Sequence, residues 1–361
     1  MQTDFLEAAY RLRDLAGQAL AADQPMQWLA HLEMAFTSAM AAGATAPVTC
    51  KLLSAAELPL ALASPNHLIA NVTRKGVVIE AALELTKQPE SDLRRFPLIG
   101  ALVSLIAKET EDVLRIVIDV GDGTDAGDYP RIAFSSARGD SLLVPDPYFY
   151  FNDNNAFYRA YVAQGAKPWA RRRDIIFWRG GSGGRRLRKP DPAHPSDWSF
   201  QQRLALCQAA RDSRHGERLD IALSHANTIG EDWLRQELAR TGFVKPEVPK
   251  LEFFEYRYLV DVDGWTNAWS LLDKLIGGAA ILKVASGFGY RQWFYDLLIP
   301  WRNYIPLAAD LSDFDEIVDW VVAHPDACEE LAANAARVSE EIQLMPDLAL
   351  SAKAAPAISL I

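Results

Sequence analysis

The sequence has few cysteines, and its positive charges do not outweigh its negative ones. Three cysteines, Cys50, Cys207 and Cys328, stand far apart in 361 residues and show no paired spacing. Such a set predicts neither a disulfide framework nor a cysteine metal site, and it indicates a reducing compartment. The formal net charge of −10 excludes a general nucleic-acid-binding protein, because those proteins carry a basic footprint.

Long apolar runs and histidine ligand patterns are missing as well. No window approaches ~18 uninterrupted apolar residues, so we expect no transmembrane helix. The opening residues, Met-Gln-Thr-Asp-Phe-Leu-Glu, are acidic where a signal peptide carries positive charge and an apolar core. The six histidines show no ligand spacing, which argues against a zinc site. We therefore expect a cytoplasmic protein, at most peripheral at the inner membrane.

The most distinctive stretch that is present runs from Asp174 to Arg188. Its apolar start, 175–178, predicts a short buried strand, and a glycine-rich loop follows. Glycines let backbone N–H groups face a ligand, and arginine forks suit phosphate. The stretch therefore predicts an anion-binding loop, with a flexible, solvated basic turn as the alternative. The candidate residues of this loop are Arg179, Gly180, Gly181, Ser182, Arg185, Arg186 and Arg188.

Other familiar site motifs are incomplete. No Gly-Lys-Ser/Thr ends the loop, as a P-loop requires, and Gly287-Phe-Gly-Tyr-Arg-Gln lacks the third glycine of a dinucleotide fingerprint. Ser182 and Ser286 lie in no Gly-x-Ser-x-Gly elbow, so a serine hydrolase is poorly supported. Asp261-Val-Asp263 imitates a metal-binding Asp-x-Asp pair, but its position at a strand end favours a structural role.

The second half shows a regular alternation of strand and helix patterns. Strand-like runs lie at 174–178, 219–223, 258–262, 280–284 and 303–307. Helical patterns lie near 197–211, 231–240, 267–276, 291–298, 312–323 and 326–343. The alternation predicts a parallel sheet with crossover helices on both faces. Ligands of such sheets bind outside the carboxyl ends of the strands, which is where the glycine-rich loop lies.

The first half is less regular. We expect helices near 5–19, 26–40 and 91–108, the last capped by Ser91, and turns near 46–48 and 58–60. Strands are expected at 67–72, 76–79, 114–120, 132–135 and 142–144. The loop after 114–120 gathers Asp122, Asp125 and Asp128 and is either a solvated loop or the source of a general base. The length predicts two domains, which we place at 1–165 and 166–340, with a tail, 341–361, that would pack back on the first.

Several longer motifs follow one another along the second half. They are Phe177–Gly184, Trp198 with Gln202-Arg203, Tyr256–Gly264, Leu271–Leu275, Gly277–Val284, Tyr290–Pro306 and Asp310–Asp313. Together these motifs resemble the capsule-associated and lipopolysaccharide-modifying glycosyltransferase family, family 90, which includes the protein O-glucosyltransferases. The resemblance covers about 115–335.

The resemblance implies an α/β fold of the GT-B type, in which two Rossmann-like domains face each other across a cleft and the C-terminal one binds the donor. It implies an inverting glycosyltransferase without an obligatory metal or other cofactor. Its partners would be a nucleotide sugar, which we expect to be a UDP-sugar, and a glycan or glycolipid acceptor such as lipopolysaccharide core or capsule. A nucleotide-dependent oxidoreductase and a noncatalytic glycan-binding protein are the alternatives.

The resemblance also implies roles for individual residues. The catalytic aspartate of the family follows a Val-Ile-x-Val-x-Asp strand and falls on Asp122; Asp128 is a second candidate because the loop is longer here. A family arginine falls on Ser270, and Lys274, one helical turn further on, would supply the missing charge. The diphosphate contacts fall on Gly181 and Ser182, then on Arg186 or Arg188; the other candidate donor contacts are Arg179, Gly180, Arg185, Asp263, Gly264 and Ser286.

Overall fold

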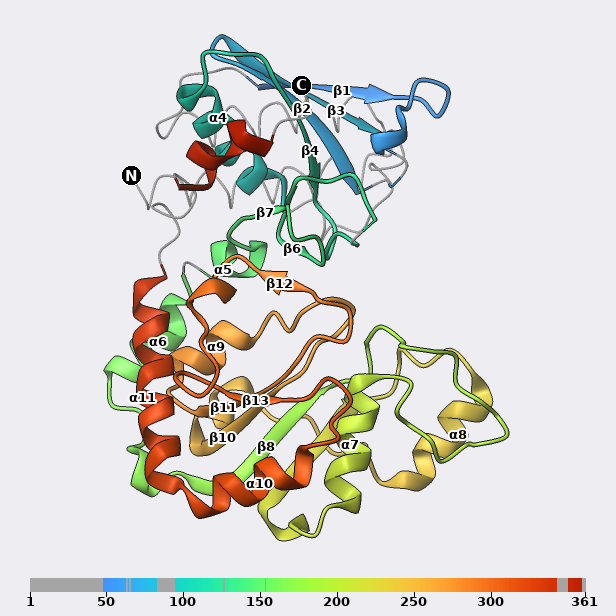
Figure 1. Ribbon diagram of the computed structural model, residues 1–361, viewed down its shortest axis with the longest axis vertical. Coiled ribbons are helices and arrows are strands. Elements are labelled where there is room, and N and C mark those ends of the chain that lie inside the picture. The colour runs from blue at the N-terminus through green and yellow to red at the C-terminus, as the bar shows by residue number, and fades with distance from the viewer. Residues whose placement is uncertain are drawn as a thin grey trace. The chain divides into compact units, whose positions relative to one another are not determined.

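The computed structural model describes residues 48–82 (without 63 and 65), 95–342 (without 126 and 153) and 350–358. Contacts divide the chain into two compact units, which we describe separately (Figure 1). The first unit comprises Met1–Asn154, Arg291–Trp293 and Gln343–Ile361, and the second comprises Asn155–Tyr290 and Phe294–Ile342. The division thus follows Asn154, whereas the sequence placed it after residue 165. The predicted helices near 5–19 and 26–40 and the Ser91 cap lie outside the described residues.

A five-stranded sheet forms the centre of the second unit. Its strands are β8 (Arg173–Gly181), β9 (Leu219–His225), β10 (Tyr256–Asp261), β11 (Ala280–Val284) and β13 (Ile305–Leu307). They lie in the order β13-β11-β10-β8-β9 and are all parallel, which confirms the predicted sheet. Because the chain leaves β8 toward one edge and returns through β10 toward the other, the order reverses between these two strands. Loops diverge at such a switch point and leave a crevice for a ligand.

Helices cover both faces of this sheet. The α-helices are α6 (Ala156–Ala163), α7 (Gln202–Asp212), α8 (Asp232–Thr241), α9 (Leu271–Ile276), α10 (Phe314–Ala323) and α11 (Pro325–Glu341). The 3-10 segments are η3 (Trp169–Arg171), η4 (Gly216–Arg218), η5 (Lys250–Glu255) and η6 (Tyr295–Leu297). Helix α7 packs on β9 and α11 on β11 (Figure 1). All five residues of β11 are buried, as expected for a strand covered on both faces.

One predicted helix of this region is wrong. Residues 291–298 form strand β12 (Arg291–Gln292) and the single turn η6. Strand β12 belongs to the first unit, where it pairs antiparallel with β6 (Ser135–Ser136). Because the backbone of Arg291 and Gln292 pairs with this strand, these residues cannot form the first turn of the predicted helix. The spacing of apolar residues in this segment therefore reflects packing and not helical periodicity.

The first unit contains a mixed sheet in the order β1-β3-β2-β4-β5-β7. Its strands are β1 (Val48–Leu53), β2 (His67–Thr73), β3 (Gly76–Ala82), β4 (Leu114–Asp119), β5 (Ile132–Ala133) and β7 (Leu142–Leu143). Strand β2 is antiparallel to both β3 and β4, so this sheet is not the purely parallel one of a Rossmann domain. Only two residues, Arg74 and Lys75, separate β2 from β3, and a parallel connection needs a dozen or more.

Three further details of the first unit differ from or refine the prediction. Residues 46 and 47 of the expected turn lie outside the described residues; the third, Val48, begins β1, a strand that was not predicted and that pairs in parallel with β3. Helix α4 (Phe96–Glu109) begins later than predicted, with a proline in its first turn, where the missing N–H is tolerated. The aromatic segment forms the short helix α5 (Pro147–Phe151), and 3-10 turns lie at η1 (Leu60–Leu62) and η7 (Ala355–Ile358). No helix in the described part of the chain has both the length and the hydrophobicity needed to cross a bilayer.

Candidate functional site

A cavity of about 250 Å³ opens in the second unit at the carboxyl ends of β8 and β9. Its lining combines charged, small and aromatic side chains from β8, β9, η5, α6 and α9. The lining residues are Tyr158, Arg179, Gly180, Gly181, Ser224, His225, Glu247, Val248, Lys250, Phe253, Phe254, Ser270, Asp273 and Lys274.

Five of the predicted donor contacts meet at this cavity. Arg179, Gly180 and Gly181 come from the end of β8, whereas Ser270 and Lys274 come from the start and the first turns of α9. They lie ninety residues apart in the sequence and are brought together because the loop after β10 leads into α9 beside the end of β8. The cavity therefore adjoins the switch point between β8 and β10, where a ligand is expected.

Three basic side chains line the cavity, and each is paired with an acidic residue. Arg179 donates from Nη2 to Asp220 Oδ1 at 3.0 Å, and its side chain is 5% exposed. Lys274 lies 2.6 Å from Asp261 Oδ1 and is buried. Burial lowers the pKa of Lys274, an effect that Asp261 opposes. The third, Lys250, is 58% exposed, and its Nζ lies 3.0 Å from Asp273 Oδ2.

The glycine-rich segment is partly strand. Strand β8 extends to Gly181, beyond the predicted end at Trp178, because Gly180 and Gly181 still pair with β9 across a bulge. A Cβ on Gly181 would lie 2.4 Å from the His225 ring, so this strand end admits only glycine without a shift. Two N–H groups of the loop bond within the protein, from Ser182 to the His225 carbonyl and from Arg185 to the Gly264 carbonyl. The loop is thus a packed turn and not the solvated alternative.

The arginines of the loop point in different directions. Arg185 donates to the Tyr290 hydroxyl, and its guanidinium lies 4.8 Å from the Phe288 ring centroid. Arg186 forms a bidentate pair with Glu231, and Arg188 bonds to Asp197. None of the three is among the residues that line the cavity. Ser182 is buried, with its Oγ 2.7 Å from Thr228 Oγ1.

The start of α7 holds the loops of the switch point together. The Gln201 amide nitrogen donates to the carbonyls of Ser182 and Gly184, at 3.0 and 2.7 Å. Arg203 donates to the Gly181 and Asp263 carbonyls, both at 3.0 Å, and so bridges the ends of β8 and β10. Arg203 was expected only as part of the motif that contains Gln202. Its contacts with two loops that are distant in the chain depend on the fold, and the spacing of residues in the sequence does not indicate them.

The two aspartates of Asp261-Val-Asp263 lie in different environments. Asp261 is fully buried between two lysines, Lys274 and Lys283, whose Nζ atoms lie 2.6 and 3.3 Å from its two oxygens. The Asp263 carboxylate is buried, and neither of its oxygens has a hydrogen-bond partner among the described residues. Burial raises the pKa of Asp263 to about 6, although Lys283 and the nearby Ser286 hydroxyl act in the opposite direction. Asp261 is therefore a structural ion, whereas Asp263 is a buried carboxylate in the loop after β10.

The two remaining predicted donor contacts, Gly264 and Ser286, lie at the same edge of the sheet. A Cβ on Gly264 would come within 2.8 Å of the Arg203 guanidinium, which explains the glycine. Ser286 Oγ accepts a bond from the Tyr290 N–H at 2.9 Å and so stabilises the turn after β11. Neither residue lines the cavity.

The candidate base Asp122 lies in the first unit, directly after β4. Its Oδ1 accepts a 2.7 Å bond from Arg95 Nη2; the Asp122 side chain is 48% exposed and that of Arg95 only 5%. The neighbouring Asp119 is buried and accepts bonds from the Gly121 N–H and the Thr124 hydroxyl at 2.7 and 2.8 Å. Burial raises the pKa of Asp119, and these bonds oppose the rise. Asp119 thus holds the loop, and Asp122 projects from it.

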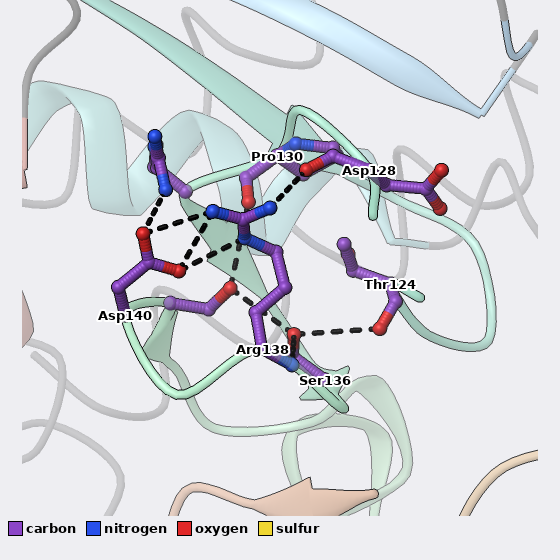
Figure 2. A network of polar contacts seen from close by, with 8 residues as sticks. Thr124, Asp128, Pro130, Ser136, Arg138 and Asp140 are labelled. Atoms are coloured by element: carbon purple, nitrogen blue, oxygen red, sulfur yellow. Dashed lines mark hydrogen bonds and ion pairs between the residues drawn. The ribbon is translucent and has the colours of Figure 1, made fainter. Parts of the chain in front are cut away.

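The second candidate base, Asp128, takes part in the internal structure of the same loop. Its Oδ2 accepts a bond from the Asp125 N–H at 3.2 Å. Figure 2 shows the Arg138 guanidinium between the Asp140 carboxylate and the backbone carbonyl of Asp128, with the Asp128 carboxylate directed away from it. Ser136 bonds to the Thr124 carbonyl in the same network. The network fixes the far end of the loop that carries Asp122.

Comparison with known proteins identifies the family. A family model described as Glycosyl transferase family 90 matches residues 156–347, more than half of the chain. Uncharacterized protein 179R of Invertebrate iridescent virus 6 is 28% identical over 184 residues, 46% of this chain and 15% of that protein. Protein O-glucosyltransferase 2 of Danio rerio is 34% identical over 130 residues, 34% of this chain and 25% of that protein. The chain thus spans a quarter or less of the length of these two relatives.

Among solved structures, Anabaena HepE in complex with UDP-glucose matches over 64% of each chain, with 11% identity and a TM-score of 0.34. At that TM-score we infer neither fold nor ligand from it. The family model, by contrast, covers nearly all of the second unit, including the cavity and the switch point. The resemblance expected from the motifs is confirmed: the chain belongs to glycosyl transferase family 90.

Proposed function

We propose that this protein transfers a sugar from a nucleoside-diphosphate sugar, with UDP as the expected nucleotide, to a hydroxyl of a glycan. The observation that carries the proposal is the meeting of Arg179, Gly180, Gly181, Ser270 and Lys274 at one cavity beside the switch point. Five donor contacts expected from two separate stretches of the chain line one cavity, in a unit that the family model covers. The architecture we propose is GT-B, with the donor held by the second unit.

The charge around the cavity suits a diphosphate. Asp261 is shared by Lys274 and Lys283, and Lys283 also acts on the nearby Asp263 carboxylate, so the two lysines balance two buried acidic groups. Arg203 adds a further cation behind the end of β8. Fixed cations and dipoles stabilise the negative charge that builds on the leaving group, and loss of one such donor typically costs ~3 kcal/mol.

We propose Asp122 as the general base. Its exposed carboxylate would accept the proton of the acceptor hydroxyl while that oxygen bonds to the anomeric carbon. The bond from the same carbon to the diphosphate oxygen breaks, and the diphosphate leaves with its electron pair. A single displacement of this kind inverts the anomeric configuration, and base catalysis typically contributes ~10²–10⁴-fold. Asp122 is preferred to Asp128 because it occupies the motif position directly after β4 and is exposed, whereas Asp128 is half-buried.

We propose that the reaction needs no metal. The Asp-x-Asp pair would be the natural ligand set, but the Asp261 oxygens are bonded to two lysines. Activity measured with excess EDTA should therefore equal activity without it. A loss that Mn²⁺ or Mg²⁺ restores would refute this part of the proposal.

The acceptor we propose is a lipopolysaccharide core or capsule glycan, modified in the cytoplasm or at the inner membrane surface. The support is the resemblance of the motifs to the capsule and lipopolysaccharide branch of the family. A panel of hexose and pentose sugar nucleotides identifies the class of sugar that the protein transfers.

The base is tested with Asp122→Asn, and Asp128→Asn serves as the matched control from the same loop. Asp122→Asn should bind UDP as the wild type does and lose transfer by at least ~10²-fold, whereas Asp128→Asn should keep most of its activity. Near wild-type transfer by Asp122→Asn would remove Asp122 as the base. NAD(P)H binding detected by fluorescence, or glycan binding without any nucleotide-sugar response, would instead favour an oxidoreductase or a glycan-binding protein.

A further inference from the structure

Of the three basic side chains that line the cavity, Lys250 is the one that is mostly exposed. Arg179 and Lys274 are buried, with side chains 5% and 4% exposed, and each is fixed on an acidic partner. Lys250 is 58% exposed, and its Nζ is paired with Asp273 at 3.0 Å. We propose that Lys250 is the movable cation of this cavity and that it leaves Asp273 to bind the phosphate of the ligand.

The energetic difference between the three cations supports this assignment. Removing Lys274 from fully buried Asp261 would leave a buried charge poorly compensated, which costs several kcal/mol. In the Lys250–Asp273 pair the lysine is 58% exposed and the carboxylate 13%, so Lys250 can turn into solvent, and Asp273 keeps its bond to Asn155 when it does. A ligand phosphate therefore recruits Lys250 at a lower cost than Lys274, whose partner Asp261 is fully buried. Ser270, which lines the same cavity, brings no charge of its own.

Asp273 keeps one hydrogen-bond partner when Lys250 moves. Its other oxygen, Oδ1, accepts a 3.0 Å bond from the Asn155 amide, and both residues are buried. The Lys250 amine also lies 5.9 Å from the Tyr158 ring centroid, on the cavity lining. Lys250 begins η5, and its long flexible side chain carries a compact charge that suits a phosphate oxygen. Asp273 thus holds the Lys250 amine at the cavity, in the position from which it would turn to the anion.

The inference rests on the proposed function only in taking the anion to be the diphosphate of the donor. Binding of UDP and of inorganic pyrophosphate to the full-length protein, measured by titration calorimetry, tests it. Lys250→Met should weaken both ligands about tenfold, as expected for one lost charged hydrogen bond. Asp273→Asn, which releases Lys250, should bind both ligands at least as tightly as the wild type. Lys167→Met, a lysine paired with Glu255 away from the cavity, should leave both affinities unchanged.

The possible results distinguish failure of the Lys250 inference from failure of the proposed donor. Unchanged affinities in Lys250→Met overturn the inference, and so does an Asp273→Asn protein that loses as much affinity as Lys250→Met, because both residues would then be structural. If the wild type binds pyrophosphate but not UDP, and Lys250→Met weakens pyrophosphate, the inference stands and the proposed donor is wrong. If the wild type binds neither, both are refuted. Melting temperatures of the variants show whether a loss of binding reflects loss of the fold.

Discussion

Asp263 has the least usual environment of the side chains around the switch point. It is buried, its oxygens have no hydrogen-bond partner among the described residues, and its pKa is raised to about 6. An uncompensated carboxylate of this kind destabilises the folded state once it ionises. A buried ionisable group that lowers the stability of the folded state is typical of functional sites.

The stability of the protein should depend on the ionisation of Asp263. The folded-state pKa, about 6, lies above the ordinary value of 3.8, so the folded state holds the proton more tightly than the unfolded state. The contribution of this group is therefore fully present below pH ~4 and declines as the pH rises through about 6. Asp263→Asn should gain stability relative to the wild type between pH 4.5 and 7.5, by an amount on the order of 2 kcal/mol.

Urea unfolding of both proteins at several pH values measures this difference. All other titrating groups are shared, so their contributions cancel in the comparison. A wild-type and variant pair whose stability difference is constant with pH would show that Asp263 does not titrate in this range. The same variant should bind UDP-sugar more weakly if the carboxylate accepts bonds from the donor.

Single residues were predicted from the sequence with uneven success. The motif positions placed Gly181, Ser270 and Lys274, which the structure brings together although they are far apart in the chain. Lys250 and Arg203 were missed as site residues because their roles depend on tertiary contacts that no local spacing encodes. Arg186 and Arg188 were predicted from their charge and from the family resemblance, and neither shows that Glu231 and Asp197 lie beside them.

Helix α9 and the 3-10 segment η5 pack against each other and together form one wall of the cavity. Gly277 follows α9, and a Cβ there would lie 2.4 Å from the Phe254 ring. Phe254 is buried, lines the cavity and packs against Tyr158 and Tyr161. The close approach of α9 to η5 therefore depends on the absence of a side chain at Gly277.

Gly277→Ala should destabilise the protein and disturb the cavity. Overpacking of this kind typically costs about 1–3 kcal/mol, and a displaced Phe254 should also weaken donor binding. Gly216→Ala is the matched control, because no heavy atom lies within 4 Å of its added Cβ. Thermal unfolding compares the two variants, and equal melting temperatures would contradict the packing described for Gly277.

Elements with a strong local signal were predicted well. All five parallel strands of the second unit were recognised, because buried strands with flanking helices give continuous apolar runs at regular intervals. The first unit was predicted less well: β1 was not predicted, and the β2–β3 hairpin makes the sheet mixed. Pairing direction is decided by connection length and tertiary context, and the apolar pattern of a single strand does not contain it.

The chain as a whole is acidic, but three of its basic side chains line the cavity in which we expect an anion to bind. The net charge is −10, yet Arg179, Lys250 and Lys274 all line one cavity. Negative charge elsewhere disfavours nonspecific anions such as nucleic acid, whereas local cations provide selective binding of a small phosphate compound. The family model falls on the same part of the chain.

The central claim is that the cavity binds the sugar nucleotide that serves as donor. Its most direct test is to measure the melting temperature of the intact protein with and without UDP-, GDP- and CMP-sugars. A ligand at 100 times its Kd stabilises the folded state by ~2.7 kcal/mol, which raises the melting temperature by several degrees. We predict that one class of nucleoside-diphosphate sugar, expected to be a UDP-sugar, gives a saturable rise and that the matching free nucleoside diphosphate competes with it. No response to any of these compounds would contradict the assignment of the cavity as a donor site.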